Sequence, residues 1–258
     1  MKPHQALSNM SSSEIENLSI LASHRVASPA RVESRSRALY LVLTLFMIIV
    51  VIAGFWPSYF GPLLRGAAPR SWIIHLHGAV FTGWMALLLI EVLLVSLGRI
   101  RQHRTVGNIG MVYGSLVFIT GVIAAFAGPV LHVRNGEWSV DRAAGFLLIS
   151  LRAITVFGGF FLAAMAYKRK PEIHKRLILL ATVALLFAPV GRLNPPVFIA
   201  VWLGPLLVAM LYDRVKRGRV HRVFVIGLVG LIVGFTPLVV WESESYLRLG
   251  RALLGIFL

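Results

Sequence analysis

The chain has 258 residues, of which 57% are hydrophobic and only 14% are charged. Soluble domains carry about 25% charged residues, so a chain this apolar cannot hide its hydrophobic surface in one water-soluble core. The absence of cysteine excludes disulfides, thiolate metal sites and cysteine nucleophiles. The formal net charge of +16 is not accompanied by a basic module with interleaved aromatic residues, so we expect no nucleic-acid partner.

The first 36 residues are polar and rich in serine. They lack the short apolar core and small-residue cleavage site of a signal peptide. We therefore expect residues 1–36 to form a disordered cytoplasmic tail.

Seven apolar segments follow the tail. An apolar stretch of about 18 or more residues is typical of a membrane-spanning helix. The sequence therefore predicts an all-α, polytopic membrane bundle of seven transmembrane helices within residues 37–241, with the lipid bilayer as its main partner. The expected spans are 38–56, 71–98, 106–131, 143–167, 176–193, 196–212 and 222–241.

Lysine and arginine are distributed unequally between alternate connections. The N-terminal tail and the loops at 99–105, 168–176 and 213–222 hold 18 of them, whereas the connections on the other side hold 7. The positive-inside rule places the side with 18 in the cytoplasm. We expect a bacterial inner (plasma) membrane protein with its N-terminus inside and its C-terminus outside. The tail at 242–258 is expected to lie along the outer surface as an amphipathic helix.

The segment 106–131 carries glycine at every seventh position, namely Gly107, Gly114, Gly121 and Gly128. Seven residues return an ideal helix to within about 20° of its starting direction. Membrane helices associate where small residues let their backbones approach. The stripe therefore predicts that this segment is the central and most buried helix.

Two histidines, His75 and His77, lie near the start of the segment 71–98. Two residues apart, they point about 200° from each other on a helix. His77 shares a face with Trp84 and Glu91, whereas His75 shares a face with small residues. We therefore interpret His77 as the functional candidate and His75 as the structural one.

Three further histidines lie at the ends of predicted spans: His103, His132 and His174. His103 and His174 stand beside basic residues, so they form either an interfacial cluster that contacts lipid phosphate or an inward pair of ligands or proton carriers. On the other side, His132 is a candidate match for His75 or His77. Histidines near both faces of a bundle are the minimum requirement for haem with histidine axial ligands at two levels.

Glu91 and Arg152 are the charged residues that lie deepest in the predicted spans. Such residues usually face the bundle interior. Their predicted depths differ by about 12 Å at 1.5 Å per residue. Three partners stay open for them: each other, a water or cofactor, or an interface reached by snorkelling.

Three motifs carry a resemblance to a known group: HxHGxxxxxW from His75 to Trp84, HRTVG at 103–107 and HKRLILLAT at 174–182. Together they resemble a bacterial multi-pass membrane family defined only as a domain of unknown function. In outline they are similar to membrane cytochromes of the b561 kind and to small assembly proteins of haem–copper oxidases. This resemblance implies haem b as the candidate cofactor.

No hydrolase nucleophile motif, phosphate loop or zinc-protease motif occurs in the chain, so the sequence names no enzyme activity. We expect an inner-membrane protein that binds haem through histidines at helix ends, with a redox or respiratory-assembly role. One alternative is a small transporter or channel with Arg152 and Glu91 lining its path. Another is a structural or assembly protein without a cofactor, acting with a membrane-protein partner or as a homo-oligomer.

Overall fold

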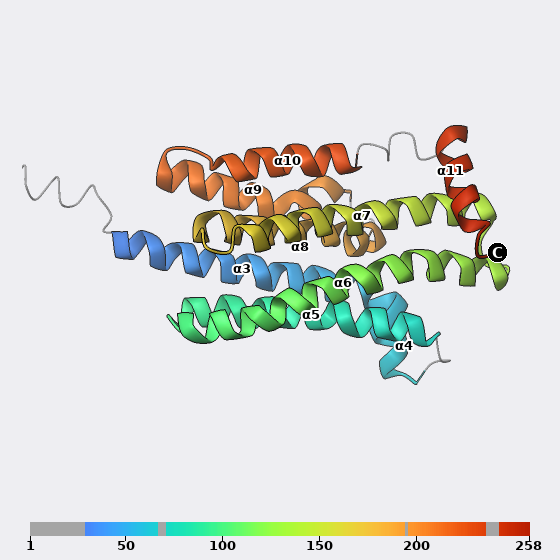
Figure 1. Cartoon of the computed structure of the whole chain (residues 1–258), viewed down its shortest axis with the longest axis horizontal. Coiled ribbons are helices and arrows are strands. Elements are labelled where there is room, and N and C mark those ends of the chain that lie inside the picture. Colours follow the sequence, from blue (N-terminus) through green and yellow to red (C-terminus); the bar gives the residue numbers. More distant parts are fainter. Residues whose placement is uncertain (1–28, 67–70, 194–195, 236–242) are drawn as a thin grey trace, which may run out of the picture.

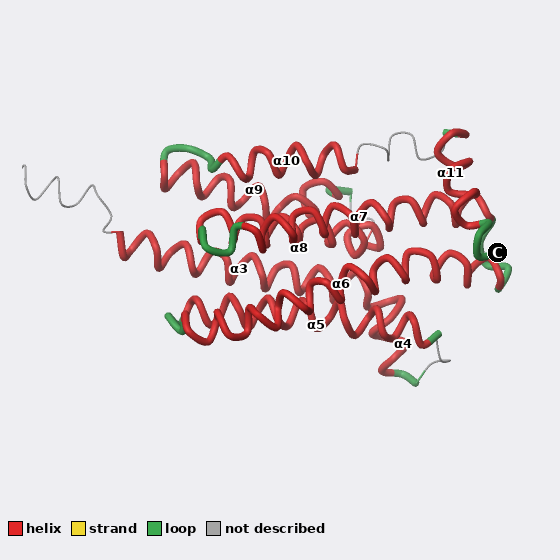
Figure 2. Tube along the Cα trace, in the orientation of Figure 1, coloured by secondary structure: helices red, strands yellow, loops and turns green. Residues whose placement is uncertain are grey.

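A computed structural model describes residues 29–66, 71–193, 196–235 and 243–258 of the chain (Figure 1). Within these ranges the chain is helical and contains no strand (Figure 2). The helices are α3 (Pro29–Phe55), the π-helical turn η1 (Trp56–Phe60), α4 (Gly61–Leu64), α5 (Trp72–Ser96), α6 (Ile100–Arg134), α7 (Val140–Ala166), α8 (Pro171–Leu193), α9 (Phe198–Arg217), α10 (Arg222–Phe235) and α11 (Glu244–Leu254).

Six of these helices are long and apolar enough to cross a membrane. They begin with Ser36–Leu64, which runs through α3, η1 and α4, and continue with α5 to α9. The expected all-α architecture is therefore confirmed for the described residues, and the six candidate spans agree with a multi-pass membrane protein. The seventh expected span corresponds to α10, which has 14 described residues, and the rest of that span lies outside the described residues. The expected N-terminal tail overlaps α3, because the helix already begins at Pro29.

The central helix is α8, and the prediction that segment 106–131 is the most buried one is wrong. The most apolar window of α8 is 61% buried, against 33% for α6. α8 packs against α3, α7, α9 and α10, whereas α6 packs mainly against α5 and α7. Small residues explain this position, because Ala181 and Ala184 are fully buried, Gly54 of α3 presses against the backbone of Pro189, and Gly227 of α10 lies on Leu180.

The glycine stripe of α6 makes two close contacts rather than one continuous seam. A side chain at Gly114 would collide with the ring of Phe161 in α7, and one at Gly121 would collide with Ile154. Nothing lies within 4 Å of the position of a side chain at Gly128. Since the direction of the stripe drifts by about 20° per heptad, a straight neighbour can follow it for only part of its length.

The end of the bundle at which α6 joins α7 is built on the long hairpin that these two helices form. α6 has 35 residues, which corresponds to about 52 Å at 1.5 Å per residue. The C-terminal helix α11 packs on α7, with Gly250 against the backbone of Ala144. Leu254 of α11 is fully buried there, in a small second core with Val130 and Leu147. The expected helix in the tail at 242–258 is thus present, and it docks on the α6–α7 hairpin.

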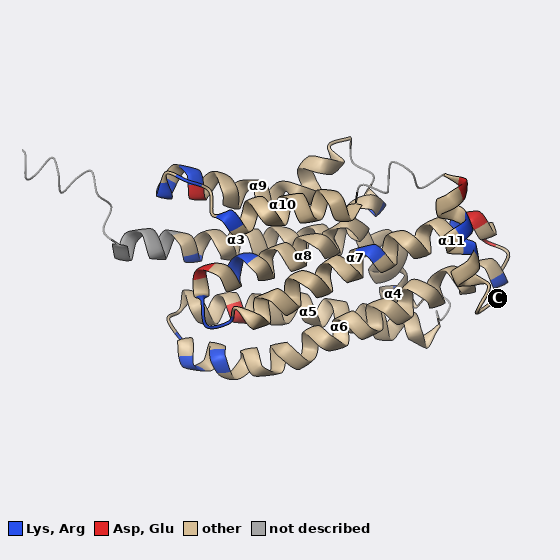
Figure 3. Ribbon diagram, turned by 45° about the horizontal axis from the view of Figure 1, so that its top comes forward, with Lys and Arg blue, Asp and Glu red and all other residues tan. Residues whose placement is uncertain are grey.

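The two ends of the bundle differ in charge. The α5–α6, α7–α8 and α9–α10 turns lie at the same end as the start of α3, and basic residues gather there (Figure 3). α11 lies at the opposite end (Figure 1). We call the end with the three basic turns the basic end.

Candidate functional site

The basic end brings three of the candidate residues together from different helices. The carboxylate of Glu91, in α5, contacts Nδ1 of His103, in the first turns of α6. His174, at the start of α8, lies within electrostatic range of both. The side chains of Glu91 and His103 are 15% and 29% exposed, so the pair is close to the surface of the bundle without leaving it. We call Glu91, His103 and His174 the inner cluster.

Both imidazoles of the inner cluster are held through the same ring nitrogen. Nδ1 of His174 donates a hydrogen bond to the backbone carbonyl of Ala164, near the end of α7, at 2.9 Å. A carbonyl only accepts, so the proton sits on Nδ1 and Nε2 carries the free lone pair. An ionised Glu91 imposes the same tautomer on His103 through Nδ1. In each ring Nε2 is therefore the nitrogen available to a ligand.

This arrangement is typical of histidines that ligate a metal, because such rings usually donate their second N–H to a carboxylate or a backbone carbonyl. The described residues contain no group of three or more histidine, aspartate or glutamate side chains that could hold a bare metal ion. The available donor set is two imidazoles on separate helices. Imidazoles on separate helices are the type of ligand that haem iron takes in membrane cytochromes.

The other candidate pair, His75 and His77 of α5, has different surroundings. Nδ1 of His75 lies 3.3 Å from the hydroxyl of Tyr59, in η1. The ring of His77 lies 4.1 Å from the ring of Phe81, and the backbone of Thr120 in α6 lies beside it. Nδ1 of His77 is buried and has no hydrogen-bond partner among the described residues.

His132 does not join His75 or His77. Its ring stacks on Trp138 with centroids 4.1 Å apart, and its Nδ1 lies 2.5 Å from the carboxylate of Glu137. Because His77 lies beside Thr120, His132 is twelve residues further along α6, which is about 18 Å. The structure therefore brings the inner histidines together and leaves the outer ones apart.

Glu91 and Arg152 do not pair with each other. Glu91 contacts His103, as described above, whereas Arg152 of α7 donates a hydrogen bond to the carbonyl of Gly234 in α10 at 3.4 Å. Glu91 is therefore paired with a histidine of α6, and Arg152 with the backbone of α10.

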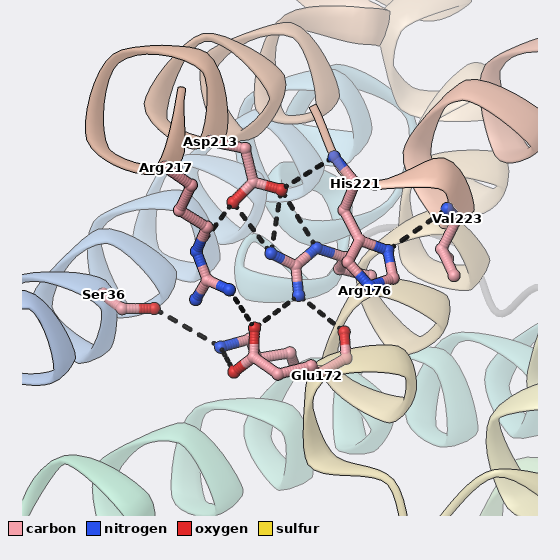
Figure 4. Close-up of polar contacts among 8 residues, drawn as sticks. Ser36, Glu172, Arg176, Asp213, Arg217, His221 and Val223 are labelled. Carbon is pink, nitrogen blue, oxygen red and sulfur yellow. Dashed lines mark hydrogen bonds and ion pairs between the residues drawn. The ribbon is translucent and has the colours of Figure 1, made fainter. Parts of the chain in front are cut away.

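A second polar centre at the basic end was missed by the sequence analysis (Figure 4). Arg176 of α8 and Asp213 of α9 are 1% and 2% exposed, and the guanidinium donates to the carboxylate at 2.8 Å and 3.2 Å. Arg176 also donates to Glu172, to its carbonyl at 2.6 Å and to its carboxylate at 2.8 Å. Arg217 bridges both acids, at 2.6 Å from Glu172 and 3.4 Å from Asp213.

This ion-pair network ties helices together rather than presenting a reactive group. Asp213 also accepts the backbone N–H of His221, at the start of α10, at 3.3 Å, and Lys175 reaches Ser36 of α3 at 3.5 Å. Partial burial, followed by the nearby Arg176, lowers the pKa of His221. The sequence signal was two acid–arginine pairs four residues apart, Glu172 with Arg176 and Asp213 with Arg217, although both arginines had been counted only as loop charges.

Comparison of the chain with protein-family models, with curated proteins and with solved structures finds no match in any of the three.

Proposed function

We propose that the chain is an inner-membrane protein with seven spans, a cytoplasmic N-terminus and an external C-terminus. The uneven distribution of lysine and arginine supports this orientation, with 18 on one side and 7 on the other. The position of α11 at the end opposite the start of α3 also supports it, since an odd number of crossings separates the two termini. In this orientation the basic end is cytoplasmic.

We further propose that the protein binds one haem b at the cytoplasmic end, with His103 and His174 as the axial ligands. The observation that carries this proposal is that both rings are held through Nδ1, by Glu91 and by the carbonyl of Ala164, so that both Nε2 atoms are available. The resemblance of the histidine motifs to membrane cytochromes adds support. A second haem at the outer level has no comparable support, because His132 lies far from His75 and His77.

When bound, the haem would supply one-electron chemistry for a redox or respiratory-assembly role. The chain's own residues position and tune it. The carboxylate of Glu91 makes the ring of His103 a stronger donor and fixes its rotation. The carbonyl of Ala164 fixes the rotation of the ring of His174 in the same way. Because this carbonyl is neutral whereas the carboxylate of Glu91 is charged, the two imidazoles differ in basicity.

The test is the visible spectrum of the full chain purified from haem-replete membranes in mild detergent. We expect a Soret band that His103→Ala and His174→Ala each abolish or shift. His221→Ala is the matched control, since His221 lies at the same end of the bundle but in the ion-pair network. A purified, folded protein without a Soret band contradicts the proposal. So does a band that survives both ligand replacements.

Glu91→Gln separates positioning from ligation. The amide keeps the shape of the side chain but removes its charge, so we expect the haem to stay bound with a raised reduction potential. Loss of negative charge next to an axial ligand disfavours the oxidised, more positive iron. An unchanged potential would contradict the role assigned to Glu91.

A further inference from the structure

Three buried side-chain polar atoms in the described residues lack a hydrogen-bond partner, and all three belong to α5. They are Nδ1 of His77, Nε1 of Trp84 and Oε1 of Glu91. Trp84 is the deepest, with 4% of its surface exposed. The other oxygen of Glu91 is satisfied by His103, so only one half of that carboxylate is unpaired.

The three residues that carry these atoms follow one another along one side of α5. The residues are spaced seven apart, so successive side chains point within about 20° of each other and lie about 10.5 Å apart along the axis. The line is about 21 Å long, which is most of the roughly 30 Å hydrocarbon core of a bilayer.

Leaving such atoms unpaired is costly. An unsatisfied polar group in hydrocarbon costs several kcal/mol, and more than about 90% of buried polar groups in folded proteins are paired. Three unpaired atoms scattered over a bundle could have three separate causes. Three on one face of one helix indicate a common partner.

The chemistry of the three atoms identifies that partner. The indole N–H of Trp84 can only donate, so it requires an acceptor. An ionised Oε1 of Glu91 can only accept, so it requires a donor, and Nδ1 of His77 can do either. A cation would leave the indole unpaired, and an anion would be repelled by the carboxylate. Water both donates and accepts, so it is a partner that satisfies all three atoms.

We propose that α5 lines a hydrated seam, in which buried water molecules bind at His77, Trp84 and Glu91. Opposite Glu91, the wall is the backbone of Gly107, which carries no side chain and whose Cβ position would lie 3.6 Å from Oε1. At the other end, the backbone of Thr120 lies within hydrogen-bonding reach of the ring of His77. The seam goes beyond the proposed haem site, because it runs from the inner cluster through the middle of the bundle.

Trp202 of α9 provides a matched control inside the same molecule. It is also 4% exposed, but its indole N–H donates to the carbonyl of Val183 at 3.0 Å. Two equally buried tryptophans therefore differ in the feature under test, namely whether a protein group satisfies the indole nitrogen.

The experiment measures exchange of indole hydrogen for deuterium in the full chain, labelled with ¹⁵N-tryptophan and held in lipid nanodiscs. The chain has 6 tryptophans, and Trp84→Phe and Trp202→Phe each remove one signal and so assign it. We expect the signal of Trp84 to exchange at least about tenfold faster than that of Trp202. Exchange at Trp202 requires its hydrogen bond and the surrounding core to open, whereas bound water already contacts Trp84.

A second measurement avoids substitutions. Brief X-ray irradiation generates hydroxyl radicals from bound water, which oxidise the side chains next to it. We expect oxidation at Trp84 and none above background at Trp202. If Trp84 exchanges as slowly as Trp202 and is not oxidised, the seam is dry and the proposal is overturned. Neither measurement depends on haem, so a missing Soret band would leave this result intact.

Discussion

The buried ion pair between Arg176 and Asp213 makes the sharpest prediction for stability. Asp213→Ala removes a carboxylate that accepts two contacts at 2.8 Å and one at 3.2 Å from the guanidinium. Removing one partner of a buried pair costs about 3–5 kcal/mol, because the other charge stays buried without compensation. Arg176 keeps its contacts with Glu172, so we expect the lower end, about 3 kcal/mol.

The assay is reversible unfolding in mixed micelles, followed by the loss of helical signal as the denaturing detergent increases. Arg169→Ala, an exposed arginine of the same end, is the control and should change the free energy of unfolding by less than about 0.5 kcal/mol. The double replacement of Arg176 by Met and Asp213 by Leu should cost much less than the two single replacements added together, since apolar side chains of similar volume need no partner. A loss below about 1 kcal/mol in Asp213→Ala, or additive single effects, would refute the reasoning.

The remaining predictions concern packing, topology and acid sensitivity. Gly114→Leu should destabilise the fold by about 1–3 kcal/mol through overpacking against α7, whereas Gly128→Leu, which faces open space, should be tolerated in the same unfolding assay. Reporter fusions at Arg134 and Lys170 should report opposite sides of the membrane, and agreement between them would contradict the topology. The pKa of His221 is lower in the folded chain than its usual 6.5, so the unfolded chain binds the proton more readily. Protonation of His221 therefore favours unfolding as the pH falls below about 6.5. We expect His221→Gln to lose less stability than the parent chain over this pH range.

The sequence predicted the helices better than it predicted their order in space. The segment 71–98 is found as α5, Trp72–Ser96, because an unbroken apolar run of that length has no other stable form in lipid. The choice of the central helix failed for a different reason. A glycine stripe shows that a neighbour can approach, but how many neighbours approach depends on the whole arrangement, and α8 is surrounded by more helices than α6.

In the candidate site, too, the sequence predicted some features and missed others. Helical periodicity placed His77, Trp84 and Glu91 on one face, and these residues carry the unpaired polar atoms of α5. The contact between Glu91 and His103 could not be predicted, since it joins two helices whose depth and rotation the sequence leaves open. The burial of Arg176 was missed because its partner, Asp213, is 37 residues away in the chain.

α7 connects the two ends of the molecule as one continuous helix. One end of this continuous helix carries the docked α11, against Ala144, and the other carries the carbonyl of Ala164 that holds the ring of His174. Twenty residues separate these positions, which is about 30 Å at 1.5 Å per residue. A rigid tilt of about 5°, pivoting at Ala144, would displace that carbonyl by about 2.6 Å over this length, enough to break the hydrogen bond. A force applied to α11 at one end of the bundle would thereby act on the imidazole of His174 at the other end.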